Sequence, residues 1–222
     1  MNGLKRMVAL KNRESAESFA KKMYLETLRQ MVLGLNLGRH EISVKPKLNS
    51  RQKYKGQSFN AKNREEGYDW PGFAFSMAGN KRLKSVRTLL ESVFRDSVEG
   101  DVMETGVWRG GMSIFIRGVM RVHGQQHRKS YVCDSFRGLP PSTLLAEKNV
   151  SWDNTPYLEV SDESVKSHFE WLGLHDPNIV FVKGFFSMTM PQLKAQRGAG
   201  GKFALLRLDG DMYESTVVRL FL

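Results

Sequence analysis

The sequence of 222 residues predicts an α/β protein, built on a mostly parallel sheet with helices on both faces. From Gly100 onward, short apolar runs alternate with segments whose apolar residues recur at helical spacing. The apolar runs are nearly continuous, which is typical of parallel strands buried on both faces of a sheet. A regular alternation of strand and helix is the pattern of a doubly wound sheet.

Four apolar runs are predicted as strands, and in chain order they cover 100–106, 130–136, 178–185 and 202–210. Helices with one apolar face are predicted over 15–37, 81–96, 110–122 and 161–174, with a weaker helix at 190–194 and another that starts at Asp211. The apolar face of the first helix is expected to consist of Phe19, Met23, Leu28, Met31 and Leu35. Gly173 is expected to terminate the helix that precedes it.

The chain is predicted to divide into a basic, helical and loop-like extension over residues 1–67 and an α/β domain over residues 68–222. Residues 1–60 hold 13 Lys and Arg against 4 Asp and Glu, so most of the net charge of +11 lies there. Such a segment can bind nucleic acid, but a solvated basic surface is the commoner case, and we do not expect nucleic acid as a partner. Residues 39–67 are polar and weakly periodic, which predicts a loop or linker. The helix at 15–37 offers its apolar face to a second copy, which suggests a homo-oligomer.

Composition excludes several classes of protein. The single cysteine, Cys133, rules out an internal disulfide framework and a zinc site built from several thiolates, and it fits a reducing compartment, so we expect a cytoplasmic protein. No apolar run approaches the ~20 residues that span a bilayer, so no membrane partner is expected. The five histidines lack zinc-ligand spacing, and no serine lies in a G-x-S-x-G elbow.

The segment METGVWRGG, residues 103–111, joins the first strand of the domain to a helix. Its glycines allow a tight turn and a close approach of the backbone to a ligand, while Glu104 supplies a carboxylate for an ammonium or hydroxyl group. In parallel sheets, ligands collect at the carboxyl ends of the strands, where helix N-termini present unpaired N–H groups. The same glycines also suit a turn that has no ligand at all.

Asp134 closes the next strand, about one strand-helix unit after the glycine turn. An acidic residue at that place can bind both hydroxyls of a ribose, so the glycine turn and Asp134 together favour a nucleoside-binding site. The alternative is a carboxylate that caps a turn or helix. A nicotinamide-dependent oxidoreductase would use the same residues, but the G-x-G-x-x-G spacing is absent.

Asp209 and Asp211 follow the last predicted strand, in RLDGDMYES. Asp211 and Glu214 have the spacing of a capping box, which gives Asp211 a structural explanation. Asp209 has no such explanation, because a carboxylate at the end of a buried strand is costly unless it is paired or bound to a metal. Oxygen ligands of this kind suit Mg²⁺, and two aspartates could divide the work between holding a metal and accepting a proton.

Three motifs together, ETGVWRGG, DSFRGLPP and LRLDGDMYEST, resemble those of the macrocin O-methyltransferases, which methylate sugar hydroxyls of macrolide and aminocoumarin antibiotics. The resemblance covers about residues 64–222 and implies a class I, Rossmann-like methyltransferase fold that uses S-adenosylmethionine and Mg²⁺. Asp209 would be the metal ligand, and Asp209 and Asp211 the catalytic carboxylates. The implied cofactor-binding residues are Ser76, Met77, Glu104, Thr105, Gly106, Val107, Trp108, Asp134, Ser135, Phe136, Arg137, Gly138, Phe186 and Ser187.

The resemblance implies a Mg²⁺-assisted O-methyltransferase for a small-molecule hydroxyl acceptor in antibiotic biosynthesis. The family also completes its metal site with an Asp-Asp doublet on a later strand, and this sequence stops at Leu222 before such a doublet. We therefore expect a C-terminally truncated domain that lacks its last strands and has an exposed sheet edge. The alternative is a non-catalytic relative that keeps affinity for a nucleoside.

Overall fold

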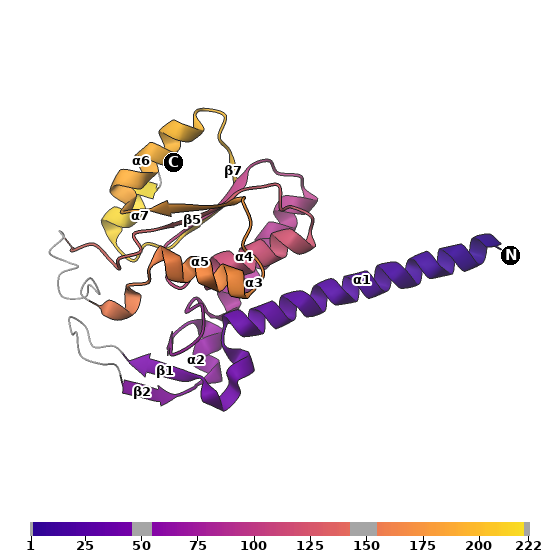
Figure 1. The fold of residues 1–222 in the computed structure, drawn as a ribbon, viewed down its shortest axis with the longest axis horizontal. Helices are drawn as coiled ribbons and strands as arrows, with labels where there is room; N and C mark the ends of the chain where they lie inside the picture. Colours follow the sequence, from indigo (N-terminus) through magenta and orange to yellow (C-terminus); the bar gives the residue numbers. More distant parts are fainter. Residues whose placement is uncertain (1, 46–54, 143–154, 220–222) are drawn as a thin grey trace.

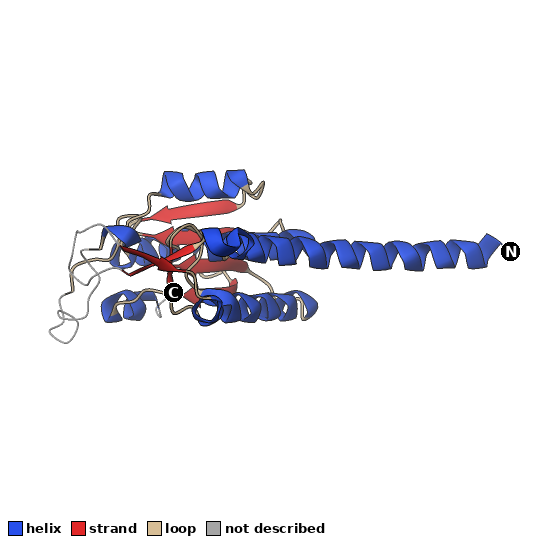
Figure 2. Ribbon diagram, turned by 90° about the horizontal axis from the view of Figure 1, so that it is seen from below, coloured by secondary structure: helices blue, strands red, loops and turns tan. Residues whose placement is uncertain are grey.

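The computed structural model describes residues 2–45, 55–142 and 155–219. Its larger sheet has four parallel strands in the order β6-β5-β4-β7. These strands are β4 (Asp101–Thr105), β5 (Ser130–Asp134), β6 (Ile179–Lys183) and β7 (Phe203–Leu208). All four lie within the predicted runs, and the parallel sheet between helices confirms the predicted α/β class (Figure 2).

Helices cover both faces of this sheet. They are α3 (Gly79–Arg95), α4 (Gly111–Val122), α5 (Asp162–Trp171), α6 (Phe186–Arg197) and α7 (Tyr213–Arg219). One core joins α3, α4 and α5 to Val102 and Val132 of the sheet, while the other face packs Met103 and Cys133 against Met190 of α6. Strands buried from both sides explain their nearly continuous apolar sequences.

The helix ends agree with local sequence in most places. The Ser161 hydroxyl accepts a hydrogen bond from the Ser164 N–H and caps the start of α5. Gly173, with φ 64°, donates its N–H to the carbonyl of Glu170, so the predicted terminator lies just beyond the end of α5. The prediction at 190–194 was too short, because α6 runs over twelve residues and contains Pro191.

The first helix, α1 (Asn2–Val32), differs from the prediction in both its length and its buried face. It begins before residue 15 and ends at Val32, because Gly34 adopts a left-handed conformation ahead of the 3-10 helix η1 (Leu35–His40). Its N-terminal half extends away from the rest of the chain (Figure 1). The buried apolar residues are Leu25, Leu28, Val32 and Leu33, whereas Phe19 is 65% exposed, so the predicted face is wrong except near Leu28 and Leu35.

Residues 39–67 are not the predicted loop, in so far as the structure describes them. They contain β1 (Ile42–Lys45), β2 (Lys55–Ser58) and α2 (Ala61–Glu66), and β1 pairs with both β2 and β3 (Trp70–Pro71) in an antiparallel sheet. This unit is held by a buried cluster of charges around Arg64. Buried charges carry no apolar periodicity, so the sequence pattern could not reveal the unit.

No helix in the described ranges has both the length and the apolar character required to cross a membrane.

Candidate functional site

A cavity of about 850 Å³, counted to its open mouth, lies where the carboxyl ends of β4, β5 and β7 meet. Its walls come from the turns after these strands, from the segment before α3 and from the start of α6. The residues that line it are Ser76, Met77, Ala78, Glu104, Gly106, Val107, Trp108, Met112, Asp134, Ser135, Gly138, Leu139, Pro140, Leu158, Phe185, Phe186, Arg207, Asp209, Gly210, Asp211 and Ser215.

Most of the residues proposed from sequence line this cavity, including Glu104, Asp134 and Asp209, but four do not. Thr105 is fully buried within the sheet, where its hydroxyl lies 3.5 Å from the carbonyl oxygen of Arg207. Phe136 belongs to the apolar core, with its ring centroid 6.0 Å from that of Phe181. Arg137 and Ser187 are exposed and do not line the cavity.

Glu104 lies on the floor of the cavity beside Arg207. The parallel register of β4 and β7 places the two residues opposite each other, and Arg207 Nη1 donates to Glu104 Oε1 at 2.6 Å. The Ser113 hydroxyl donates to the other carboxylate oxygen. Glu104 is only 2% exposed, and this burial raises its pKa to about 7, although Arg207 and Ser113 both favour the charged form.

Arg207 connects Glu104 to Asp209. Its second terminal nitrogen, Nη2, donates to Asp209 Oδ2 at 2.5 Å, so one guanidinium bridges two carboxylates of the cavity. Arg207 was not among the site residues predicted from sequence. The available signal was a charged residue inside an apolar strand, two positions before Asp209 and therefore on the same side of the strand.

Asp134 organises the glycine turn. Its Oδ2 accepts the backbone N–H of Val107 at 2.8 Å and lies 3.4 Å from the N–H of Trp108, while Oδ1 accepts the N–H of Phe136 at 2.9 Å. These contacts are those expected of a carboxylate that caps a turn, the alternative role that the sequence allows for Asp134. The Ser135 hydroxyl also donates to Oδ1 at 3.3 Å, so the four acceptor positions of the carboxylate are occupied, and a ligand hydroxyl in the cavity would replace the long contacts with Ser135 and Trp108.

Asp209 and Asp211 both line the cavity, but Asp211 is not the N-cap of a capping box. Helix α7 begins at Tyr213, and Asp211 has φ 54°, whereas an N-cap residue has an extended backbone. The Asp209 side chain is 49% exposed and is paired with Arg207, which offsets the cost of its position at a strand end. Among the described residues, no three Asp, Glu, His or Cys side chains form a group that would hold a metal by themselves.

The rest of the cavity wall is apolar and was also missed from sequence. Met112, Leu139, Pro140, Leu158 and Phe185 join the predicted Phe186 there. Apolar residues give no chemical signal in a sequence, because the same types fill every core. A cavity with apolar walls and a few converging polar groups is the usual form of a small-molecule site.

The four-stranded parallel sheet, its glycine turn into α4 and the cavity at its carboxyl edge define a class I, Rossmann-like methyltransferase fold. The solved structure of the O-methyltransferase NovP superposes with a TM-score of 0.76 and 32% identity, over 90% of this chain and 77% of NovP. The family model for macrocin-O-methyltransferase (TylF) matches residues 19–221. The chain belongs to this family.

Two characterised relatives are natural-product enzymes. The 8-demethyl-8-(2,3-dimethoxy-α-L-rhamnosyl)-tetracenomycin-C 4′-O-methyltransferase of Streptomyces olivaceus is 42% identical over 154 residues, which cover 68% of this chain and 57% of the relative. The demethyldecarbamoylnovobiocin O-methyltransferase of Streptomyces niveus is 39% identical over 160 residues, which cover 69% of this chain and 58% of the relative. The matched region thus spans under two thirds of either relative.

Proposed function

We propose that the chain binds S-adenosylmethionine and transfers its methyl group to a hydroxyl of a small-molecule natural product, most simply a sugar hydroxyl. The observation that carries the proposal is the meeting of Glu104, Asp134 and Asp209 in one cavity at the carboxyl edge of the sheet. Both relatives are named as O-methyltransferases, and the name of the first places a rhamnosyl group on its substrate.

The cavity offers complementary surfaces to the parts of this cofactor. Glu104, at the end of β4, would accept hydrogen bonds from the ammonium group of the methionine moiety. Asp134, at the end of β5, would accept hydrogen bonds from the ribose hydroxyls. The apolar wall with Leu139, Pro140 and Phe186 would contact the adenine ring. The sulfonium is already a reactive methyl donor, so the chain's main tasks are orientation and activation of the acceptor.

The carboxylates at the rim fit a magnesium ion, since Mg²⁺ accepts one or two carboxylates and keeps several waters. Asp209, half exposed and lining the cavity, would hold it. Such an ion lowers the pKa of a coordinated hydroxyl. Asp211 would accept the proton that leaves the acceptor oxygen, and Arg207 would keep Asp209 ionised and oriented.

The function is tested by calorimetry with S-adenosylhomocysteine, followed by methyl transfer to desmethyl glycosides of the tetracenomycin and novobiocin types. We expect saturable binding with one cofactor per chain and methyl transfer that depends on Mg²⁺. Binding without turnover would favour the non-catalytic alternative. The absence of binding would contradict the proposed function altogether.

Affinity for S-adenosylhomocysteine is expected to rise between pH 6 and pH 8. Burial raises the pKa of Glu104 to about 7, so its carboxyl group becomes negatively charged over this interval. Of its charged neighbours, Arg207 lowers this pKa and Asp209 raises it. The ligand's ammonium is charged throughout, and its attraction to Glu104 therefore strengthens as pH rises. Calorimetry at both pH values measures the change, and the Glu104→Gln variant should bind weakly with no such rise.

The Asp209→Asn variant is expected to lose divalent-cation affinity by about tenfold or more, because Mg²⁺ and Mn²⁺ prefer charged carboxylates to amides. Binding of Mn²⁺, followed by its paramagnetic signal, measures this without any turnover. Asp96→Asn serves as the control, since that carboxylate is exposed, pairs with Arg95 and lies outside the cavity. An Mn²⁺ affinity that is equal in the two variants would contradict the assignment of Asp209.

A further inference from the structure

We propose that Arg109 is a positioning residue that holds residues 71–74, and thereby the cavity wall at Ser76, Met77 and Ala78, and that it shares this task with a buried cluster of Glu41, Arg64 and Asp69. The inference rests on the proposed function, since it concerns the same cavity. Arg109 lies in the segment METGVWRGG directly after Trp108, and no role in binding or catalysis has been given to it so far.

Arg109 donates hydrogen bonds to the backbone of residues 71–74. Its Nη1 donates to the carbonyl oxygens of Ala74 at 3.0 Å and Gly72 at 3.1 Å, and lies 3.5 Å from that of Pro71. The guanidinium stacks over the ring of Trp108, 4.2 Å from its centroid. A planar cation that binds carbonyls at its edge and an aromatic ring on its face is a use of arginine that lysine cannot reproduce.

Residues 71–74, which Arg109 binds, lead directly into the cavity wall. Ser76, Met77 and Ala78 line the cavity immediately after the carbonyls that Arg109 binds. The carbonyl of Phe75 accepts the N–H of Gly111, the first residue of α4, at 3.0 Å. A Cβ on Gly111 would lie 2.5 Å from that carbonyl, so the backbone at Phe75 packs directly against the N-terminus of α4 and leaves no space for a side chain at position 111. A displaced wall would therefore change the cavity directly.

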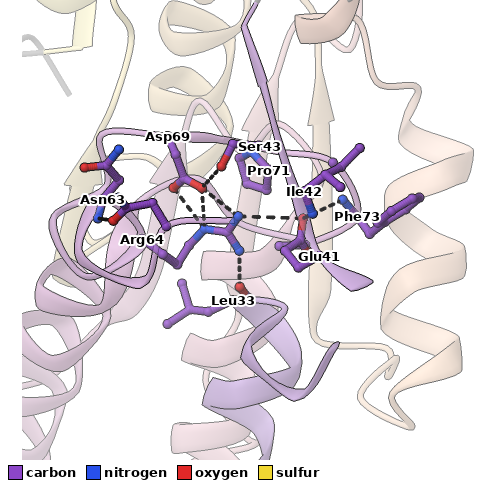
Figure 3. Close-up of polar contacts among 12 residues, drawn as sticks. Leu33, Glu41, Ile42, Ser43, Asn63, Arg64, Asp69, Pro71 and Phe73 are labelled. Atoms are coloured by element: carbon purple, nitrogen blue, oxygen red, sulfur yellow. Dashed lines mark hydrogen bonds and ion pairs between the residues drawn. The ribbon is translucent and has the colours of Figure 1, made fainter. Parts of the chain in front are cut away.

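A second arginine, Arg64, is linked to the same stretch through Glu41 (Figure 3). Arg64, whose side chain is 0% exposed, donates to both carboxylate oxygens of Asp69 and to the carbonyl of Leu33. Its Nη2 lies 3.7 Å from Glu41 Oε1, which accepts the N–H of Phe73 at 3.1 Å. Residues 71–74 are thus hydrogen-bonded both to Glu41, at the N–H of Phe73, and to Arg109, at the carbonyls of Gly72 and Ala74.

The four charges balance, with Glu41 and Asp69 against Arg64 and Arg109. Asp69 engages Arg64, and the second oxygen of Glu41, Oε2, is buried and accepts no hydrogen bond from the described residues. Burial lowers the pKa of Arg109, and Tyr157 and Glu41 oppose this change. Glu41 and Arg109 therefore meet through the backbone of residues 71–74, to which both are hydrogen-bonded.

Arg117 of α4 provides the control for Arg109, which lies in the turn before this helix. The Arg117 side chain is 0% exposed, whereas Arg109 is partly buried, and Arg117 makes an ion pair with Asp176 at 2.7 Å. It further donates to the carbonyls of Arg128 and Gln126, and it does not line the cavity. Replacing Arg117 therefore removes a buried arginine with its ion pair and its carbonyl contacts, and lowers stability, without a direct effect on the cavity wall.

The test measures the affinity for S-adenosylhomocysteine by calorimetry, hydrogen exchange of residues 72–78 and the midpoint of thermal unfolding. For Arg109→Met we expect about tenfold weaker binding and faster exchange over 72–78, since small displacements of a binding wall are costly. For Arg109→Lys we expect about threefold weaker binding in a folded chain, since the charge stays and the fork is lost. For Arg117→Met we expect a lower unfolding midpoint with an unchanged dissociation constant.

Each outcome decides the inference. The inference would be overturned if Arg109→Met bound S-adenosylhomocysteine as tightly as the parent chain does. It would also be overturned if Arg117→Met lost as much affinity as Arg109→Met. Neither result would affect the proposed function. If Arg109→Met does not fold, Arg109→Lys decides by the same comparison with Arg117→Met. Failure of the parent chain itself to bind S-adenosylhomocysteine would overturn the proposed function, and the inference would fall with it.

Discussion

Replacing Gly106 with alanine is expected to abolish binding of S-adenosylhomocysteine and to lower the free energy of unfolding by about 3 kcal/mol or more. Gly106 has φ 77°, and an added Cβ would lie 1.7 Å from the carbonyl oxygen of Asp209. Backbone bonds hold both partners, because the N–H of Gly106 donates to Cys133 and that of Asp209 donates to Thr105. The ends of β4 and β7 must therefore separate, and Glu104 and Asp209 with them.

Gly124→Ala separates steric overlap from backbone strain in this experiment. Gly124 also has a positive φ, 68°, but no atom lies within 4 Å of an added Cβ. Its substitution should cost only about 1 kcal/mol and leave cofactor affinity unchanged. Calorimetry and urea unfolding of both variants provide the comparison. Similar losses at the two positions would show that the close approach of β4 and β7 has no special importance.

The Arg64→Met variant is expected to lose about 3–5 kcal/mol of stability, the usual result of removing one partner from a buried ion pair. Asp69 and Glu41 would remain buried, at 6% and 1% exposure, without their nearest cation. The carbonyl of Leu33 would lose a charged donor as well. The free energy of unfolding, obtained from urea titrations of the parent chain and the variant, measures the loss.

Arg87→Met is the matched control for Arg64→Met. Arg87 pairs with Glu91 at 2.7 Å on α3, but the two side chains are 36% and 34% exposed. A pair at that exposure contributes under about 1 kcal/mol, because water screens it. A change of less than 1 kcal/mol in Arg64→Met as well would mean that the residues around Arg64 rearrange to rehydrate the carboxylates.

Several parts of the fold could be predicted because the signals are local. The four parallel strands, helices α3, α4 and α5 and the glycine after α5 follow from periodicity and turn chemistry. The α1 face was misjudged for a related reason. Periodicity identifies an apolar stripe, but Phe19 and Leu25 differ in burial because the rest of the chain packs only against the C-terminal part of α1.

The unit described over residues 41–45 and 55–71 could not be predicted in this way. Its buried polar contacts come from Arg64, Asp69 and Glu41, which resemble ordinary surface charges in the sequence. A charged side chain can be buried only when its partners are brought to it. Which charges meet depends on the pairing of β1 with β3 and on the end of α1.

Neighbours along the chain are sufficient to predict the α/β class, the strands, the glycine turn and the positions of Glu104, Asp134 and Asp209 after strands. The contacts of Arg207 with Glu104 and Asp209, and of Arg109 with residues 71–74, form only when distant parts of the chain pack together. Arg207 and Glu104 are 103 positions apart, and they meet because β4 and β7 pair in one particular register. Register and burial are set by the packing of the whole chain, and no local pattern encodes them.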